Sequence, residues 1–282
     1  MQLSNFDLDS FLRMAMAEDI GDGDHTSLST IAEGSMGKGQ LLVKDTGILA
    51  GITIAQRVFE LIDPTLKFER LLEDGSPIKP GDIAFKLYGS SRSITTGERL
   101  ALNILQRMSG IATKTNRIQS LLAGTGCKLL DTRKTTPGFR YFEKLAVKIG
   151  GGVNHRFGLY DMILVKDNHS DYSGGVGKAL ENVKTYLEIS GRQLKIEAEA
   201  RNLEEVRVIL ESGIVFRILL DNFKPEQLRE AVKLIDGRCE TEASGGIVEA
   251  NVREYAQCGV NYISMGALTH QINSLDLSLK AF

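Results

Sequence analysis

A regular series of short apolar runs, each closed by a polar residue or a glycine, most restricts how this chain can fold. Six such runs follow Gly126, and they end at Asp131, Lys166, Glu199, Asp221, Ser244 and Gly266, at intervals of 35, 33, 22, 23 and 22 residues. Helical patterns fill the intervals, and strand–helix repeats of this length are typical of βα units in a parallel sheet. The regularity favours a barrel over a doubly wound sheet, and six strands instead of eight predict an incomplete barrel.

The sequence before this series has a different pattern. Residues 6–18 have helical spacing, short strand-like pieces lie between Gly37 and Arg92, and helical patterns cover Ala55–Ile62 and Thr96–Leu122. We therefore predict an α/β protein with an N-terminal α+β domain over residues 1–109. The incomplete parallel α/β barrel is expected over residues 110–267, with the tail 268–282 joined to the first domain.

Composition excludes several classes of protein. The 282 residues hold 34 Lys and Arg against 36 Asp and Glu, a net charge of −2, which argues against a general nucleic-acid or membrane-surface binder. The three cysteines form no CxxC pair, as expected in a reducing compartment and not in a disulfide framework or a zinc site. No basic signal segment precedes an apolar core, and no apolar run reaches the ~20 residues of a membrane span. These observations predict a cytoplasmic globular protein.

Basic residues gather at the predicted strand ends, where barrels of this kind form their sites. Arg133 and Lys134 follow the first run, His155 and Arg156 follow three consecutive glycines, and Lys166 ends the second run. Guanidinium groups bind carboxylate or phosphate in two-pronged fashion, and an ammonium adds a point charge. The same residues also suit solvated turns, and a lone histidine is more often structural. A metal pair of His155 with His169 has no accompanying carboxylates or cysteines at ligand spacing.

Two acidic residues end successive runs of the series. Glu199 and Asp221 suit ribose hydroxyls, Mg²⁺ or a developing positive charge, although salt bridges to the nearby basic residues are an alternative. Glu197 shares the strand face of Glu199 one layer deeper and is a secondary candidate. The sequences EASGGI and SMGAL place Ser244, Gly245, Gly246 and Gly266 where the last βα loops of a barrel receive a phosphate.

Two further segments carry weaker signals. The sequence EDIGDGDHTS over residues 18–27 has the composition of a metal loop but lacks the ligand pattern and closing Glu of an EF-hand, so we interpret it as a structural turn. In GERLALNILQRMSGIAT, residues 97–113, helical spacing alone predicts core leucines and isoleucines and a solvated Arg99.

Taken in order, these motifs resemble one enzyme family. The series ERLALNILQRMSGIAT, DTRKTTPGFR, GGGVNHRFGL, KDNH, EAEA, LLDNF, EASGGI and SMGAL is similar to quinolinate phosphoribosyltransferase, over nearly the whole chain. The resemblance implies a transferase that converts quinolinate and 5-phosphoribosyl 1-pyrophosphate (PRPP) with Mg²⁺ to nicotinate mononucleotide, pyrophosphate and CO₂, in NAD biosynthesis. EAEA and EASGG replace the commoner EVEV and ESSGG, and neither change alters Glu199 or Ser244.

The resemblance also implies residue roles, motif by motif. It places the quinolinate carboxylates on Arg133, His155, Arg156 and Lys166, the catalytic lysine at Lys134, and the ribose and Mg²⁺ of PRPP at Glu199 and Asp221. It assigns the binding of the 5′-phosphate to Ser244, Gly245, Gly246 and Gly266. It further implies a homodimer in which Arg99 reaches the site of the other subunit, with a higher assembly left open.

Three other functions remain open at the level of sequence. One is a ModD-like protein or another pyridine phosphoribosyltransferase, which activity with quinolinate but not nicotinate separates from the main interpretation. A second is a non-catalytic barrel that binds PRPP and releases neither pyrophosphate nor CO₂. The third is a barrel isomerase or aldolase with Lys166 as its reactive amine.

Overall fold

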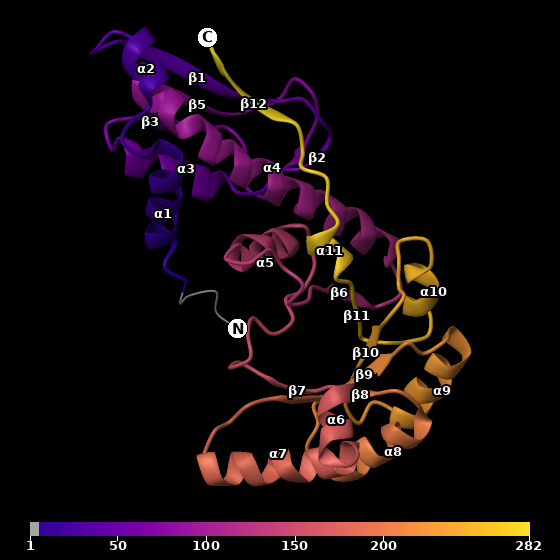
Figure 1. Cartoon of the computed structure of the whole chain (residues 1–282). Helices are drawn as coiled ribbons and strands as arrows, with labels where there is room; N and C mark the ends of the chain where they lie inside the picture. Colours follow the sequence, from indigo (N-terminus) through magenta and orange to yellow (C-terminus); the bar gives the residue numbers. More distant parts are fainter. Residues whose placement is uncertain (1–5) are drawn as a thin grey trace. The chain divides into compact units, whose positions relative to one another are not determined.

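The computed structural model describes residues 6–282 and divides into two compact units (Figure 1). Residues 1–5, which belong to the segment where the sequence predicts no targeting signal, lie outside the described residues. One unit contains residues 117–135 and 152–270. The other contains the chain up to Asn116 together with residues 136–151 and 271–282. Each unit has its own sheet.

The first unit is built on a six-stranded parallel sheet. Its strands are β6 (Lys128–Leu130), β7 (Ile163–Val165), β8 (Ile196–Ala200), β9 (Arg217–Asp221), β10 (Glu240–Ser244) and β11 (Tyr262–Ser264), in the order β6-β11-β10-β9-β8-β7. All six predicted runs form strands, and the predicted incomplete parallel barrel is confirmed. The carboxyl ends of these strands therefore lie at one edge of the sheet, where the predicted site residues follow them.

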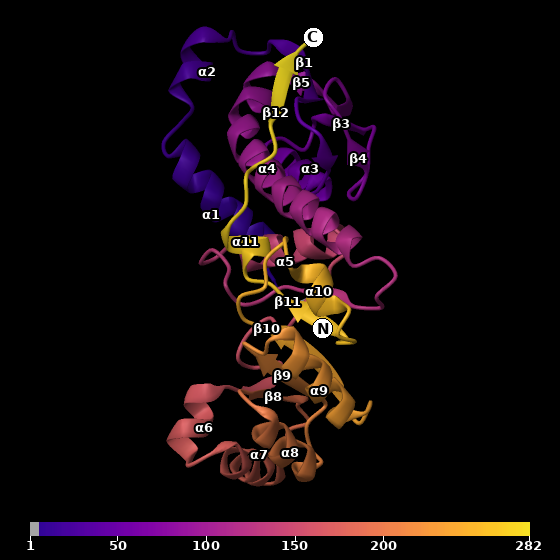
Figure 2. The same cartoon turned by 90° about the vertical axis from the view of Figure 1, so that its right-hand side faces the viewer.

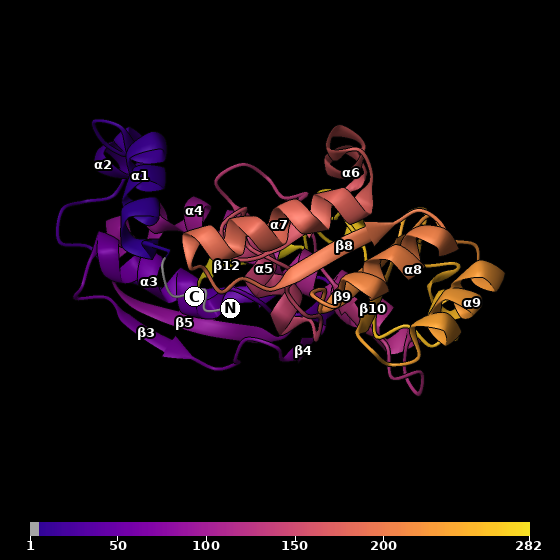
Figure 3. The ribbon, with the colours of Figure 1, turned by 90° about the horizontal axis from the view of Figure 1, so that it is seen from below.

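Helices follow the strands in chain order. They are α6 (Asp167–Ser173), α7 (Val176–Ser190), α8 (Leu203–Ser212), α9 (Pro225–Ile235), α10 (Val252–Ala256) and α11 (Ala267–His270). Figure 3 shows α7, α8 and α9 in a row beside β8, β9 and β10. Local sequence sets their limits: the Asn202 side chain accepts the Glu205 N–H at the start of α8, and Gly213 ends that helix in the left-handed conformation.

The second unit contains an antiparallel sheet of order β12-β1-β5-β3, made of β1 (Met36–Val43), β3 (Lys67–Arg70), β5 (Ile83–Ser90) and β12 (Leu277–Ala281). Short strands β2 (Gly47–Ile48) and β4 (Pro77–Ile78) pair separately. Strand β12 pairs along β1, from Gly39 with Ala281 to Val43 with Leu277 (Figure 2). The last strand of the chain is thus a member of the sheet that the first strand begins.

Five helices complete this unit or begin in it: α1 (Leu8–Ile20), α2 (His25–Thr30), α3 (Ile52–Ile62), α4 (Ser91–Leu121) and α5 (Arg140–Ile149). The segment ILAGIT, residues 48–53, is one of the strand-like pieces that the sequence predicts between Gly37 and Arg92. This prediction was wrong beyond Ile48, because Gly51 turns the chain with φ of 105° and α3 starts at once. The EDIGDGDHTS segment ends α1 and starts α2, where the Asp24 side chain accepts the Ser27 N–H at 3.0 Å. This capping agrees with a structural turn.

Close packing holds α3, α4 and the sheet together. Gly97 of α4 lies against Phe59 of α3, so a Cβ at Gly97 would lie 2.6 Å from the Phe59 ring. Phe59 in turn meets Phe85 of β5, which stacks on Phe68 of β3 with ring centroids 4.4 Å apart. Large side chains on the helix and sheet therefore require a small residue on α4.

Among the described residues, no helix combines the length and the apolar character that a membrane crossing requires. Cys127, Cys239 and Cys258 are all free thiols, as the sequence predicts.

Candidate active site

The register of the parallel sheet arranges the site residues in layers. Glu197 of β8 lies opposite Arg217 of β9, and Arg217 lies opposite Glu240 of β10. Two residues farther along each strand, Glu199 and Glu242 flank Leu219. Because side chains alternate in direction along a strand, residues two apart share a face. The strands therefore carry one charged layer below another on the same face.

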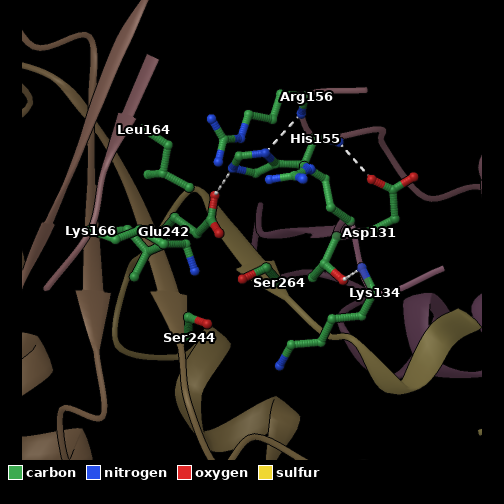
Figure 4. A pocket seen from close by; sticks show the side chains of 12 residues that line it. Asp131, Lys134, His155, Arg156, Leu164, Lys166, Glu242, Ser244 and Ser264 are labelled. Atoms are coloured by element: carbon green, nitrogen blue, oxygen red, sulfur yellow. Dashed lines mark hydrogen bonds and ion pairs between the residues drawn. The ribbon is translucent and has the colours of Figure 1, made fainter. Parts of the chain in front are cut away.

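A cavity of about 150 Å³ opens at the carboxyl ends of the strands, and we name it the cationic cavity. Figure 4 shows its side chains, with Glu242 facing the His155 ring. The sequence-predicted residues that line it are Arg133, Lys134, His155, Arg156, Lys166 and Ser244; Asp131, Thr132, Leu164, Leu219, Glu242 and Ser264 complete the lining. The fold thus brings together basic residues from three separate stretches of sequence.

Two guanidinium groups of this cavity act on each other. Burial lowers the pKa of Arg156, and the nearby positive charge of Arg133 lowers it further. The Arg156 side chain is held by a hydrogen bond from its Nη1 to the carbonyl of Met162 at 3.2 Å. Because two cations at short range repel, an anion bound between them relieves an existing cost. The cavity is suited to a ligand with more than one negative charge.

Asp131 fixes the loop that carries the cavity histidine. Its fully buried carboxylate accepts the backbone N–H of His155 at 2.8 Å and the side-chain amide of Asn154 at 2.6 Å. Sequence reasoning marked Asp131 only as the end of a strand. In the sequence, Asp131 is an acidic residue between an apolar strand and a basic motif. Its role becomes visible only in the fold, where the loop after the three glycines lies against it.

Opposing neighbours set the protonation of His155. Burial lowers the pKa of His155, whereas the carboxylates of Glu197 and Glu242 beside Nε2 act to raise it. On the other side of the ring, the backbone N–H of Arg156 donates to Nδ1 at 2.8 Å, and this bond exists only while Nδ1 carries no hydrogen. Two N–H groups cannot face each other at that distance, so Nδ1 carries no hydrogen. The ring holds its hydrogen on Nε2.

His155, Glu197 and Glu242 lie close enough together to resemble a metal site, since one ligand atom of each lies within 4.8 Å of the others. A cation already occupies their neighbourhood: Nη1 of Arg217 lies 3.3 Å from Oε2 of Glu242 and 3.8 Å from Oε2 of Glu197. The guanidinium therefore offsets part of the negative charge of the two carboxylates, and the group is an internal charge network. His169 takes no part in it; its Nδ1 accepts the N–H of Lys166 at the start of α6.

A second cavity, of about 400 Å³, adjoins the first, and we name it the carboxylate cavity. Glu199, Asp221 and Asn222 line it together with the loop Ser244–Ile247 and the segment Ser264–Ala267. Burial and the charge of Asp221 raise the pKa of Glu199 to about 7. Burial also raises the pKa of Asp221, although the Asn222 amide and Lys166 oppose this. Two carboxylates that resist ionisation in this way are stabilised by a cation placed between them.

The donor set of this cavity fits Mg²⁺. Carboxylate oxygens are the protein ligands that this ion prefers, and it usually keeps waters or substrate oxygens in its remaining positions. Glu199 and Asp221 supply such oxygens, and their raised pKa values show that a compensating positive charge is favourable there.

Glycines shape the floor of the carboxylate cavity. Gly245 has a φ of 91°, and a Cβ there would collide with the Asn222 side chain. At Gly266 a Cβ would lie 2.8 Å from Cδ of Lys134 and 3.0 Å from Nε2 of His270. At Gly245 the left-handed backbone and the close Asn222 require glycine, whereas a Cβ at Gly266 would displace the Lys134 and His270 side chains. Bare backbone of this kind suits the approach of a phosphate group.

Lys134 and Lys166 line both cavities. The carbonyl of Lys134 accepts the Thr269 hydroxyl at 2.7 Å, and its N–H donates to Thr132 Oγ1 at 3.0 Å. The backbone under Lys134 is therefore held from two sides. A ligand spanning both cavities would contact these two ammonium groups at its centre.

Eleven of the twelve sequence-predicted site residues line at least one of the two cavities. The exception is Arg99, which is exposed on α4. Sequence reasoning did not single out several other lining residues, which are Asp131, Thr132, Asn222, Glu242, Ser264 and His270. It also did not single out Arg217. Thr132 and Asn222 are each next to a predicted residue in the sequence, and Asp131, Glu242 and Ser264 are each two residues from one.

Comparison with known proteins decides the family. Residues 24–109 match the family model of the quinolinate phosphoribosyl transferase N-terminal domain, and residues 111–280 match that of its C-terminal domain. The chain belongs to the quinolinate phosphoribosyltransferase family. It is 44% identical to quinolinate phosphoribosyltransferase [decarboxylating] 2, mitochondrial, of Nicotiana glauca, over 98% of this chain and 82% of that protein.

Two other matches to this quinolinate phosphoribosyltransferase family member cover nearly the full length of both proteins. A probable nicotinate-nucleotide pyrophosphorylase [carboxylating] of Bacillus subtilis is 40% identical, with 98% of this chain and 94% of that protein covered. The crystal structure of NadC from Streptococcus pyogenes superposes with a TM-score of 0.93 at 38% identity, covering 100% of this chain and 99% of that one.

Proposed function

We propose that this protein is a decarboxylating quinolinate phosphoribosyltransferase that converts quinolinate and PRPP to nicotinate mononucleotide, pyrophosphate and CO₂ in NAD biosynthesis. The observation that carries this function is the pair of adjoining cavities. One is cationic and the other combines carboxylates with glycine loops, and Lys134 and Lys166 line both. A dicarboxylate and a phosphorylated ribose need such a pair.

In the cationic cavity, Arg133, Arg156 and Lys166 would bind the two carboxylates of quinolinate. Arg133 and Arg156 already repel each other there, so a dianion gains from both. Both ring nitrogens of His155 face protein groups, so we place His155 in the wall of this subsite. These contacts orient the pyridine nitrogen toward the neighbouring cavity.

In the carboxylate cavity, Glu199 and Asp221 would hold the ribose, and Ser244, Gly245, Gly246 and Gly266 the 5′-phosphate. As pyrophosphate leaves C1, positive charge develops on the ribose, and the two carboxylates stabilise it. Lys134, between the cavities, stabilises the negative charge that develops on the leaving group. The pyridine nitrogen then attacks C1.

The cofactor we propose is Mg²⁺, held by oxygens of Glu199 and Asp221 either directly or through water and PRPP. When bound, the ion neutralises phosphate charge. After the nitrogen has become quaternary, the bond between the adjacent carbon C2 and its carboxylate breaks and CO₂ leaves. The electron pair stays on C2, where the pyridinium charge stabilises it, and C2 then takes up a proton from water. The cationic cavity keeps the remaining carboxylate in place.

Carboxyl-labelled quinolinate tests the function directly. Protein, Mg²⁺, PRPP and the labelled acid are mixed, and released CO₂ and pyrophosphate are counted. Equal amounts of both, dependent on PRPP, support the proposal. Nicotinate in place of quinolinate, with release of pyrophosphate, would instead indicate another pyridine phosphoribosyltransferase, and PRPP binding without either product would indicate a binding protein.

We also propose a homodimer in which Arg99 of one subunit serves the site of the other, as the resemblance implies. Arg99 is exposed on α4, as a residue offered to a partner must be. Mixing two inactive variants, Arg99→Ala and Lys134→Ala, tests the arrangement. Restored activity requires that the two residues serve one site from different subunits, and its absence after subunit exchange contradicts the proposal.

The predicted cytoplasmic location remains a proposal, for which cell fractionation is the measurement. Relatives of this family carry names that include mitochondrial and chloroplastic forms.

A further inference from the structure

Four buried charged residues lie in and behind the wall of the cationic cavity, and the proposed reaction gives none of them a contact with substrate. His155 stands on the glycine-rich loop, Glu197 on β8, Arg217 on β9 and Glu242 on β10, and each is at most 8% exposed. Charged side chains in a protein interior are costly unless they are paired, and apolar residues of similar size are often as stable. Because burying four such residues at a cavity wall is costly, we look for a role beyond stability.

Distances define how the group is connected. Nε2 of His155 lies 2.9 Å from Oε2 of Glu197 and 3.4 Å from Oε2 of Glu242. On the far side of the carboxylates, Arg217 is anchored by Glu240 at 2.8 Å and stacks over the Tyr262 ring at 4.2 Å. The two carboxylates are therefore held between a fixed guanidinium and one edge of the imidazole ring.

The other edge of the ring leads into the cavity. Nδ1 of His155 accepts the backbone N–H of Arg156 at 2.8 Å. Asp131 accepts the backbone N–H of His155 itself, so the loop is fixed on both sides of the histidine. A chain of contacts thus runs from the carboxylates through the ring to the backbone of Arg156, whose guanidinium lines the cavity.

We propose that Glu197 and Glu242 are positioning residues for the dicarboxylate substrate, holding His155 with its hydrogen on Nε2 so that Nδ1 fixes Arg156 in the cavity wall. The proposal rests on the proposed function, since it concerns the quinolinate subsite. Asp131 accepts the backbone N–H of His155, and Glu197 and Glu242 lie beside its Nε2. Arg217 contacts these two glutamates, and Arg156 directs its backbone N–H at Nδ1. Because Arg217 already lies beside the two carboxylates, we expect them to accept the Nε2–H of His155 and not to bind a free metal ion.

Glu242→Gln and Glu197→Gln test the proposal, with Glu240→Gln as the matched control. Glu240 lies on the same strand as Glu242 and binds the same arginine, but it is partly exposed and does not face His155. We expect KM for quinolinate to rise about tenfold in the first two variants, the loss of roughly one charge-assisted contact. KM for PRPP should stay within about twofold, since its cavity is intact. Glu242→Asp, which restores the charge, should recover part of the loss.

Equal rises in both KM values, or the same rise in Glu240→Gln, would overturn the positioning role and leave only a role in stability. A wild-type chain that releases no CO₂ contradicts the proposed function instead. Active wild type with unchanged KM for quinolinate in both glutamine variants contradicts this inference alone.

Nitrogen-15 NMR of histidine-labelled wild-type protein provides a measurement that does not depend on whether the variants fold. His155→Asn identifies the signal by its loss. At pH 7.5 we expect one protonated and one unprotonated ring nitrogen, with the proton coupled to the nitrogen assigned as Nε2. Two protonated nitrogens, or a hydrogen on Nδ1, would show that the ring does not accept the Arg156 N–H.

Discussion

The two cavities of the barrel unit handle charge in opposite ways. In the cationic cavity, the loop that carries His155 and Arg156 is tied to buried carboxylates, through Asp131 on one side and Glu197 and Glu242 on the other. In the carboxylate cavity, Glu199 and Asp221 face a common space, and the pKa of each is raised. The first arrangement is fixed by the protein's own contacts, whereas the second favours the binding of a positive charge.

This difference predicts which substitutions remove activity and which only shift it. Lys134→Ala and Arg156→Ala should each lower activity by at least ~10²-fold, because each removes a cation from binding or from the transition state. Exposed residues that line neither cavity serve as controls: Lys128→Ala and Arg192→Ala should be close to wild type. Steady-state kinetics with both substrates measures the effect, and near-normal turnover in both cavity variants would contradict the site.

The raised pKa of Glu199 predicts a pH dependence confined to the carboxylate cavity. Ribose and Mg²⁺ require the ionised carboxylate, which predominates only above the pKa of about 7. We expect kcat/KM for PRPP to fall about tenfold per pH unit below 7 and to level off above it. A flat profile between pH 5.5 and 8 would remove the contrast between the two cavities.

Gly245 tests whether bare backbone matters in the carboxylate cavity. Gly245→Ala places a Cβ against Asn222 at a φ of 91°, so the loop must shift. KM for PRPP should rise about tenfold while KM for quinolinate changes little, since one charged contact to phosphate is disturbed. Gly237→Ala, at a φ of 69° with no atom near its Cβ and outside both cavities, separates backbone strain from the loss of phosphate contact.

Glu199→Gln should stabilise the ligand-free protein while it impairs activity. The pKa of Glu199 lies near 7 in the folded protein against an ordinary value of 4.5, so its ionised form destabilises the fold at higher pH. This cost is full above pH 7 and fades as the pH falls toward 4.5. An increase in Tm of about 2 °C is expected at pH 8, and no increase at pH 5. A lower Tm of the variant at pH 8 would contradict the claim that the ionised Glu199 carboxylate destabilises the folded protein.

The smallest effect is expected at His169. Its imidazole is exposed and accepts the Lys166 N–H at the start of α6, so His169→Ala removes a cap worth about 1 kcal/mol. Activity should change by less than about twofold, since the side chain lines neither cavity. A large loss would indicate that the cap also orients Lys166, and the fixed character of the cationic cavity would then extend to that residue.

Much of this architecture could be predicted, because a polar residue or a glycine closes each apolar strand of the parallel sheet. Six apolar runs, among them those that end at Lys166, Glu199 and Asp221, located the six strands, and the residues at their ends line the two cavities. Buried partners were harder to find, because Arg217 begins strand β9 and Glu242 lies in the middle of β10, so neither residue marks the carboxyl end of a strand. Their importance comes from lateral register, in which Arg217 lies opposite Glu197, and register depends on contacts between residues far apart in the sequence.

The pairing of β12 with β1 has a consequence for biosynthesis. The six-stranded sheet is fully synthesised once Ser264 has been added, whereas β1 lacks its partner until Leu277–Ala281 leave the ribosome. One flank of β1 therefore stays an unpaired edge through most of translation, and such edges recruit other chains. The exposed Lys38 on this strand, together with its glycines, weakens that tendency while the chain waits for its last strand.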